Sequence, residues 1–310
     1  MIKFSIIVPI YNVEKYLENC LNSIAHQTFN SYEVIIVCDK CQDNSEKIVN
    51  NYVTKYKWQK IYEEKTGLAK ARNLGVAKSN GEYLVFIDGD DYVKEDFLET
   101  LNNSLNDKPD VLRFQIQDRI ENKVVEHKEK GFKIVNGIDA FEKIIKYHYI
   151  ENAWAYCYNR TYWQTNKFKY MEGCIAEDYG LTPIIIAQAT KVKSIPYIGY
   201  NYVQRYYSLM NNNDYKFKLK KMDDMLKQYE FEKSILRRIK NNEVFLRFLN
   251  NSLIYYSTTL KYKDFKKYKK ILKEKECFSH LKGKSLKYKI RNFMIKNNAY
   301  FYYNYIMRLR

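Results

Sequence analysis

Short apolar runs alternate with amphipathic helical patterns over the first hundred residues. The uninterrupted apolar runs are those of strands buried on both faces of a sheet, and they lie at residues 4–8, 34–37 and 83–87, with a weaker run at 61–62. The helical patterns between them lie at residues 14–27, 48–56 and 68–78. Strands that alternate with helices predict an α/β fold, with right-handed crossovers and a mostly parallel sheet covered on both faces.

The ends of these strands hold the candidate chemistry. They read Pro9-Ile10-Tyr11-Asn12, Cys38-Asp39 and Asp88-Gly89-Asp90-Asp91. Ligands of parallel sheets bind beyond the carboxyl ends of the strands, and two of these three ends carry carboxylates. The chain contains neither a G-x-G-x-x-G after the first strand nor a P-loop motif. An acidic edge of this kind binds phosphate through a divalent cation, so the pattern predicts Mg²⁺ or Mn²⁺.

Length and composition exclude several classes of protein. The chain has 310 residues, 46% of them apolar and 29% charged, which predicts one large or two modest globular domains. No window approaches the roughly 18 apolar residues of a membrane-spanning helix, and no secretory signal is visible. We therefore expect neither a secreted, nor a collagen-like, nor an integral membrane protein.

Six cysteines without a signal peptide indicate reduced thiols in a cytosolic compartment. Cys38 and Cys41 form a C-x-x-C pair after an apolar strand, an arrangement that also occurs at redox and zinc sites. Asp39 and Lys40 lie between them, and no second pair completes a zinc tetrad. Both alternatives are therefore disfavoured.

The function of the D-x-D segment is indicated by the motifs that precede it in the sequence. By itself, Asp88-Gly89-Asp90-Asp91 is also typical of a turn or a helix cap, where Asp and Gly are favoured. In this chain it follows a strand that ends P-x-Y-N, a strand that ends in an Asp with Asp43-Asn44-Ser45 behind it, and a G-L-x-x-A-R-N helix start at residues 67–73. In this order the four motifs resemble those of the family-2 glycosyltransferases, which have the GT-A fold. Later segments extend the resemblance to about residue 210, with Glu177-Asp178 similar to the E-D motif and Tyr202, Arg205 and Ser208 similar to the Y-x-R…S segment.

The resemblance implies a role for each matching residue. It implies that Asp39 accepts a hydrogen bond from the nucleotide base, that Tyr11 lines the base pocket and that Asp88 lies near the ribose. A uracil imide N–H is a suitable donor for an Asp at a strand end. It further implies that Asp90 binds the metal, assisted by Asp91, which offsets the charge of a diphosphate leaving group. The other expected nucleotide-sugar-binding residues are Pro9, Asn12, Arg72 and Gly89.

Two roles stay open at this level. Arg72 either serves the nucleotide or braces Asp88, and a structural ion pair is an equal alternative. Asp178 precedes an apolar helical pattern at residues 181–189, where an Asp caps the helix. The resemblance implies that Asp178 is the general base, which deprotonates the acceptor hydroxyl for an attack that inverts the anomeric carbon. Asp178 can serve both as a helix cap and as a general base.

The acceptor region departs from the family pattern. Trp154-Ala155-Tyr156 stands where a Trp is often followed two residues later by Lys, and Asp39-Lys40-Cys41 replaces the usual Asp-Gly-Ser. Lys40 either meets phosphate or is solvated. Trp154, Tyr156, Tyr158 and Trp163 either stack on sugars or belong to the core. The expected contacts with the acceptor or the diphosphate are Trp154, Glu177, Arg205 and Ser208.

Charge separates the last third of the chain from the rest. Residues 1–214 carry 27 Lys and Arg against 28 Asp and Glu, whereas residues 215–310 carry 26 against 8. We expect a nucleotide-sugar-binding half at 1–105, an acceptor-binding half at 106–214, and a basic helical region at 215–310. The pattern at 286–309 is typical of an interfacial amphipathic segment bound to anionic lipid. The alternative is a packed helical extension with a solvated lysine face.

The resemblance implies an inverting, metal-dependent transfer of a hexose, with galactose or an N-acetylhexosamine favoured, from a UDP-sugar to a growing, lipid-linked surface glycan. It places the enzyme in the cytoplasm, on the inner face of the plasma membrane. A nucleotidyltransferase is one rival, although the chain lacks its basic phosphate loop. A nucleic-acid-binding protein is the other, disfavoured because acidic strand ends repel a polyanion, so we expect no nucleic acid partner. Nothing in the sequence indicates an oligomeric state.

Overall fold

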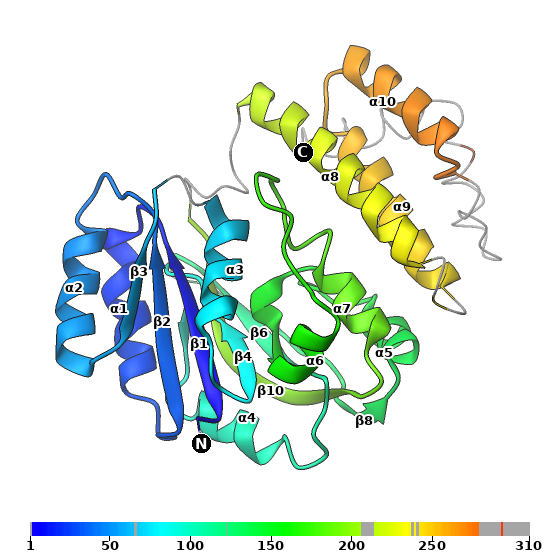
Figure 1. Ribbon diagram of the computed structural model, residues 1–310. Coiled ribbons are helices and arrows are strands. Elements are labelled where there is room, and N and C mark those ends of the chain that lie inside the picture. Colours follow the sequence, from blue (N-terminus) through cyan, green and yellow to red (C-terminus); the bar gives the residue numbers. More distant parts are fainter. Residues whose placement is uncertain are drawn as a thin grey trace. The chain divides into compact units, whose positions relative to one another are not determined.

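The computed structural model describes residues 2–64, 67–121, 123–205, 214–236, 239, 242–278 and 293. The chain forms two compact units, Met1–Asn211 and Asn212–Arg310, called unit 1 and unit 2 below. Unit 1 contains a large sheet with helices, and unit 2 contains helices (Figure 1). The sheet of unit 1 continues across residue 105, so the two expected halves of residues 1–214 share one sheet.

Within the described residues, ten strands form the sheet of unit 1. Six of them run parallel to one another: β1 (Phe4–Ile10), β2 (Tyr32–Cys38), β3 (Gln59–Tyr62), β4 (Tyr83–Phe86), β6 (Val111–Ile120) and β10 (Val192–Val203). The other four are β5 (Tyr92–Val93), β7 (Lys123–His127), β8 (Phe132–Val135) and β9 (Tyr156–Asn159). The order is β3-β2-β1-β4-β9-β6-β10-β5, with β7 paired to β6 and β8 paired to β10.

The strand order decides where the candidate site forms. Strand β9 lies between β4 and β6 and is antiparallel to both. Strands β4 and β6 therefore point the same way, and β10 runs parallel to β6. As a result, the carboxyl ends of β1, β2, β4, β6 and β10 all lie at one edge of the sheet, called the carboxyl edge below.

The helices of unit 1 confirm the predicted alternation. They are α1 (Glu14–Ala25), α2 (Ser45–Tyr56), α3 (Gly67–Lys78), α4 (Phe97–Asn103), α5 (Gly137–Ile144), α6 (Arg160–Thr165) and α7 (Thr182–Gln188), with a 3₁₀ turn η1 (Ala153–Ala155). Helix α1 buries one face, as its periodicity predicts: Leu17, Cys20, Leu21 and Ile24. It ends at Ala25, two residues before the predicted end.

Helix α3 carries the arginine of the predicted site and packs closely on the sheet (Figure 1). Ala71 lies in a core cluster with Ile35 and Val37 of β2. The helix approaches β1 so closely that a Cβ atom at Gly75 would lie 2.3 Å from Cγ2 of Ile7. Only glycine allows this approach, and the approach fixes the height of Arg72 above the strands.

Unit 2 contains α8 (Tyr215–Leu236), α9 (Glu243–Ser257) and α10 (Tyr262–Glu274), as expected for a helical region. Helix α9 packs against both α8 and α10. Tyr268 of α10 donates a hydrogen bond to Asp223 of α8 at 2.7 Å, which ties the outer helices together. Apart from Phe293, the predicted interfacial segment at 286–309 lies outside the described residues. Among the helices described, none combines the length and the apolar character needed to cross a membrane.

Candidate active site

The D-x-D segment forms a tight turn directly after β4. The N–H of Asp91 donates to the carbonyl of Asp88 at 2.9 Å, which closes the turn. A Cβ atom at Gly89 would lie 2.6 Å from Cδ1 of Ile10 and 3.3 Å from the carbonyl oxygen of Pro9. Glycine is therefore required at position 89, because the turn lies against the end of β1. This contact brings two of the predicted strand ends together.

Arg72 braces the D-x-D turn from beneath. Its side chain is 1% exposed and donates to Oδ1 of Asp88 at 2.9 Å, and it also forms an ion pair with Glu177. Burial opposes the charge of Arg72, but Asp88 and then Glu177 raise the pKa of the guanidinium well above its usual range. Its burial between two carboxylate partners disfavours a direct contact between Arg72 and the nucleotide. The bracing alternative is confirmed.

The Glu177-Asp178 pair precedes α7 in a turn with a strained backbone. Ala176 has a φ of 55°, a left-handed conformation that a residue with a Cβ rarely adopts. Glu177 is buried and holds Arg72, which disfavours its expected contact with acceptor or diphosphate. Burial raises the pKa of Glu177, Arg72 lowers it and Asp178 raises it, so Asp178 lies beside this ion pair.

Asp178 does not cap α7 as predicted. The helix begins at Thr182, and Leu181 is its N-cap without a side-chain hydrogen bond. The main-chain carbonyl of Asp178 accepts from the N–H groups of Leu181 and Thr182, at 3.2 Å and 3.0 Å. The carboxylate is half-buried. With the capping role removed, the general-base prediction for Asp178 is the one that stays.

Asp90, like Asp88, faces an arginine. Its Oδ2 lies 2.6 Å from Nε of Arg205, and the guanidinium of Arg205 lies 5.6 Å from the ring centre of Tyr16. Burial raises the pKa of Asp90, while Arg205 lowers it and Asp88 raises it. A carboxylate in this environment is stabilised by positive charge. Arg205 therefore reaches the D-x-D turn, and its contact with a diphosphate stays a prediction, whereas Ser208 lies outside the described residues.

Asp91 is held inside the fold. Its Oδ2 accepts from the hydroxyl of Tyr200 at 2.7 Å and its Oδ1 from the N–H of Val203 at 2.8 Å, and the residue has no exposed surface. Burial raises the pKa of Asp91 well above its usual range, and Asp90 and Asp88 raise it further. This placement favours a positioning role over direct contact with a metal ion.

Tyr200 is a site residue that the sequence analysis missed. Its hydroxyl accepts from the N–H of Asp88 at 3.2 Å while it donates to Asp91, so it holds both ends of the turn. It lies in β10, and its register opposite Val93 and Ile116 comes from strand pairing. The sequence signal is a tyrosine two residues before Tyr202 of the predicted Y-x-R…S segment, which by itself indicates core packing.

The end of β2 lies beside the start of α3. Oδ2 of Asp39 accepts from the N–H of Gly67 at 3.1 Å, and Oδ1 accepts from the N–H of Lys40 at 2.7 Å. Asp39 is half-buried at the carboxyl edge, which is the position that the predicted contact with the nucleotide base requires. Lys40 is exposed and forms an ion pair with Glu64 at 3.2 Å, which supports the solvated alternative.

The end of β1 presents the predicted ring. Tyr11 is 54% exposed, so its face is accessible to a base. Asn12 follows with a φ of 49°, and its side-chain oxygen accepts from the N–H of Gln42 at 2.8 Å, which ties the end of β1 to the loop after β2. Pro9 is buried within β1 beside Val37, so it shapes the strand end rather than contacting a ligand.

The aromatic residues of the expected acceptor site belong to the core. Trp154 is 2% exposed and lies between Tyr200 and Tyr202, with ring centres 4.8 Å and 5.1 Å away and interplanar angles of 10° and 16°. The expected stacking of Trp154 on a sugar is therefore wrong, because neighbouring rings cover both of its faces. The remaining members of the set are buried as well: Tyr156, Tyr158 and Trp163.

Neither cysteine of the C-x-x-C pair forms a disulfide. Cys38 and Cys41 are free thiols, and burial raises the pKa of Cys38 to about 12. A thiol of this kind stays protonated at neutral pH and is a poor nucleophile or metal ligand.

In the part of the chain that the structure describes, no group of three or more His, Cys, Asp and Glu side chains is placed to hold a metal ion. The available ligands are the oxygens of Asp90, with Asp88 beside it. Such hard oxygen ligands fit Mg²⁺ or Mn²⁺, which bind through one or two carboxylates when a substrate phosphate completes the shell.

The comparisons with known proteins agree with this geometry. A family model described as glycosyl transferase family 2 matches residues 5–174, more than half of the chain. The chain belongs to this family. The match includes the ends of β1 and β2, the start of α3 and the D-x-D turn, while Asp178 and Arg205 follow it in the chain.

Several family members are similar over part of the chain. GlyG of Streptococcus pneumoniae is 39% identical over 106 residues, which are 34% of this chain and 35% of GlyG. EpsJ of Bacillus subtilis is 29% identical over 199 residues, 62% of this chain and 58% of EpsJ. The chain therefore spans about a third to three fifths of the lengths of these relatives.

The fold is that of solved glycosyltransferases. The structure of Staphylococcus aureus TarS residues 1–349 in complex with UDP-GlcNAc has a TM-score of 0.58 and 20% identity, covering 85% of this chain and 83% of that one. The related complex with UDP has a TM-score of 0.57. The fold is thus the GT-A fold, an α/β fold with a sheet flanked by helices. Further helices follow it in the sequence.

Proposed function

We propose that this chain transfers a hexose, with galactose or an N-acetylhexosamine favoured, from a UDP-sugar to a hydroxyl of a growing surface glycan, with inversion at the anomeric carbon. The observation that carries the proposal is the arrangement of Asp39, Asp88 and Asp90 at one sheet edge in a member of glycosyl transferase family 2. The S. aureus TarS structures with UDP and UDP-GlcNAc, which have the same fold, support a UDP-sugar donor.

On this proposal the donor lies across the ends of β1, β2 and β4. The exposed ring of Tyr11 stacks on the base, and Asp39 accepts from its imide N–H. Asp88 is held by Arg72 and by Tyr200, so its orientation is fixed before the donor arrives. Such preorganisation lowers the entropy that binding costs.

Asp90 is the proposed metal ligand and would hold a Mn²⁺ or Mg²⁺ ion near the diphosphate. A bound divalent ion supplies positive charge at the leaving diphosphate. Arg205, which already lies against Asp90, is placed to contact the same diphosphate once the donor is bound.

Asp178 is the proposed general base. The residue is half-buried and directly follows Glu177, whose ion pair with Arg72 ties this segment to Asp88 of the D-x-D turn. It would accept the proton of the acceptor hydroxyl as that oxygen attacks the anomeric carbon and the UDP leaves. Because Glu177 is bound by Arg72, Asp178 rather than Glu177 is the carboxylate of this motif that reaches the acceptor.

The decisive experiment measures UDP release from a panel of UDP-sugars, with and without Mn²⁺, for the wild type, Asp90→Ala and Asp178→Asn. We expect Asp90→Ala to lose metal-dependent turnover, and Asp178→Asn to keep UDP affinity while turnover falls by about 100-fold or more. Asp107→Ala serves as the control, since Asp107 is an exposed carboxylate that pairs with Lys193. Full metal-dependent turnover by Asp90→Ala would refute the metal assignment, and wild-type turnover by Asp178→Asn would refute the base.

We also propose that unit 2 binds the anionic inner face of the plasma membrane, where a lipid-linked acceptor would lie. Helix α10 supports this, since its buried side consists of Phe265, Tyr268 and Leu272, while five of its lysines are exposed: Lys263, Lys266, Lys267, Lys270 and Lys273. Each basic residue near such a surface contributes on the order of 1 kcal/mol.

Sedimentation with vesicles tests this attachment. We expect the full chain to pellet with phosphatidylglycerol vesicles at low salt, and a variant with Lys263, Lys266 and Lys270 changed to Glu to stay in solution. A variant with Lys47, Lys55 and Lys57 changed to Glu, all in or beside α2 of unit 1, controls for net charge. Equal recovery of the wild type with phosphatidylcholine vesicles would contradict the proposal.

A further inference from the structure

A second polar cluster lies at the carboxyl edge, away from the D-x-D turn. Its members, called the Asp118 cluster below, are Asp118, His127, His148, Tyr149 and Gln204. Asp118 lies near the end of β6, His127 ends β7, and Gln204 follows β10. Since β4, β6 and β10 are parallel, this cluster and the D-x-D turn lie at the same edge of the sheet.

Asp118 is the centre of the cluster. It is buried, and its Oδ1 accepts from the hydroxyl of Tyr149 at 2.5 Å. Its Oδ2 accepts from Nε2 of Gln204 at 2.9 Å and lies 3.1 Å from Nε2 of His127. A single buried carboxylate therefore orients three polar side chains that come from three separate segments. Such an arrangement holds the groups in place before any ligand arrives.

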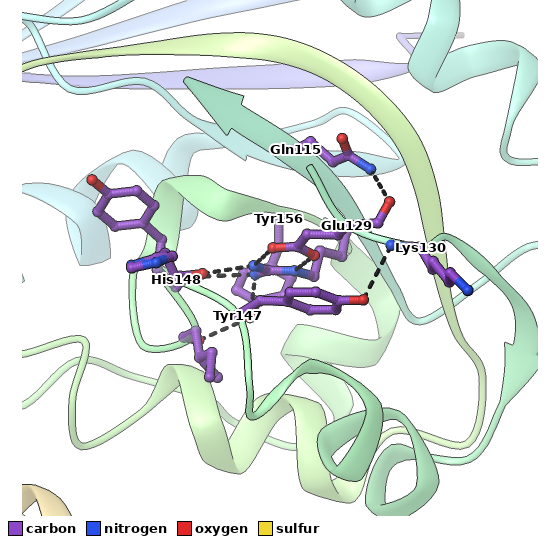
Figure 2. A network of polar contacts seen from close by, with 9 residues as sticks. Gln115, Glu129, Lys130, Tyr147, His148 and Tyr156 are labelled. Carbon is purple, nitrogen blue, oxygen red and sulfur yellow. Dashed lines mark hydrogen bonds and ion pairs between the residues drawn. The ribbon is translucent and has the colours of Figure 1, made fainter. Parts of the chain in front are cut away.

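A buried ion pair fixes the loop that carries His148 and Tyr149. Arg113 of β6 binds both oxygens of Glu129, with Nε to Oε2 at 2.7 Å and Nη2 to Oε1 at 2.5 Å. The same guanidinium donates to the carbonyl of His148 at 2.7 Å. Figure 2 shows Glu129 and His148 within this network of polar contacts. Tyr149 has a φ of 57°, an unfavourable conformation for a residue with a Cβ. The fold thus uses a buried charge pair to hold a strained loop in one place.

An unbroken series of aromatic contacts joins this cluster to the D-x-D turn. The ring centre of Tyr149 lies 5.4 Å from that of Tyr202, and Tyr202 stacks on Trp154 at 5.1 Å. Trp154 stacks in turn on Tyr200, whose hydroxyl binds Asp91. The Asp118 cluster is therefore held at a fixed place relative to the turn that would hold the diphosphate.

The accessible members have the chemistry of a hydroxyl-binding site. Gln204 and His148 are exposed, and His127 and Tyr149 are half-buried. The rings of His127 and His148 are 4.6 Å apart, so they form one surface. Amide and imidazole groups both donate and accept hydrogen bonds, which suits the hydroxyl groups of a sugar. The buried carboxylate of Asp118 disfavours an anionic ligand at the same place.

We propose that the Asp118 cluster binds the acceptor, as a subsite for an uncharged sugar residue next to the transferring centre. This inference rests on the proposed function. Gln204, His148 and Tyr149 contact the hydroxyl groups and one face of that sugar, and Asp118 is the positioning residue that orients them. The cluster thereby sets which acceptor is used, without contact with the donor.

Ligand-observed NMR tests this subsite on the full chain. Saturation-transfer difference spectra are recorded with methyl β-D-galactopyranoside, methyl N-acetyl-β-D-glucosaminide and glycerol 3-phosphate, each in the presence of UDP and the diamagnetic ion Mg²⁺. The variants are Asp118→Asn, Tyr149→Phe and Gln204→Ala. Gln204 is exposed, so this last substitution leaves folding intact. Glu126→Gln is the matched control, since it neutralises an exposed carboxylate on the same strand as His127.

We expect the wild type and Glu126→Gln to bind a neutral glycoside. In the three cluster variants the glycoside signal should fall by about fivefold or more. Their UDP affinity, measured by calorimetry, should change less than about twofold. Unchanged glycoside signal in Gln204→Ala and Tyr149→Phe would overturn the inference. So would binding of glycerol 3-phosphate alone, or UDP binding without any glycoside signal. If the wild type did not bind UDP, the proposed function itself would fail.

Discussion

Removal of the Arg72 guanidinium offers the sharpest test of how the candidate site is built. Arg72→Met keeps an unbranched apolar side chain of similar helix propensity, but it removes the guanidinium, whose carbon lies 5.9 Å and 5.7 Å from the ring centres of Phe86 and Tyr170. What it removes is the positive charge between Asp88 and Glu177. Any loss of stability therefore reports on the two ion pairs.

The size of the effect follows from the burial of the two carboxylates. The Glu177 side chain is 6% exposed, whereas that of Asp88 is 21% exposed and is partly hydrated after the change. Removal of one partner from a buried ion pair costs about 3–5 kcal/mol, because the remaining charge has no compensation. Since only Glu177 is deeply buried, we expect unit 1 to lose about 3 kcal/mol of its free energy of unfolding.

The loss depends on pH with a definite sign. Burial already raises the pKa of Glu177, and without Arg72 the pKa rises further. A carboxyl group whose pKa is raised in the fold contributes stability below its unfolded pKa of about 4.3, and this stability is lost as the pH rises through the folded value. The gap between Arg72→Met and the wild type is therefore smaller at pH 5 than at pH 8.

Urea unfolding followed by tryptophan fluorescence measures this, because all three tryptophans lie in unit 1: Trp58, Trp154 and Trp163. Lys70→Met is the matched control, as it removes a partly exposed ion pair with Glu63 from the same helix and is expected to change stability far less. The double variant Arg72→Met with Glu177→Gln should regain part of the loss. A loss below about 1 kcal/mol at pH 8, or an equal loss at both pH values, would refute the reasoning.

Three further predictions concern single positions. Gly89→Ala places a Cβ 2.6 Å from Cδ1 of Ile10, which lowers the free energy of unfolding by about 1–3 kcal/mol and displaces the D-x-D turn. UDP affinity measured by calorimetry should therefore fall, and an unchanged affinity would contradict the tight packing. Trp154→Ala should lower the free energy of unfolding by about 3–5 kcal/mol in the urea assay, and an effect below about 1 kcal/mol would show that Trp154 is not a core residue. Iodoacetamide at pH 8 should label the partly exposed Cys41 well before Cys38, whose pKa burial raises to about 12, and peptide mass spectrometry that found the reverse would contradict the burial of Cys38.

The sequence by itself determined the elements and the chemistry of the strand ends. Apolar runs and helical periodicity identified β1, β2, β4, α1 and α3 to within a few residues, because burial against a sheet requires that periodicity locally. The acidic ends were equally visible, since a carboxylate directly after a buried strand lies at the sheet edge whatever the rest of the chain does. The ordered motifs then indicated the family, which the match over residues 5–174 confirms.

Only the tertiary structure decided what these side chains contact. Arg72 and Glu177 are 105 positions apart, and their ion pair exists because the turn before α7 folds back onto α3. Trp154 is core rather than sugar-binding because β10 places Tyr200 and Tyr202 on its two faces. Local patterns specify which side of an element is buried, but they carry no information about which distant element covers it. That choice depends on strand order and register, which the packing of the whole unit decides.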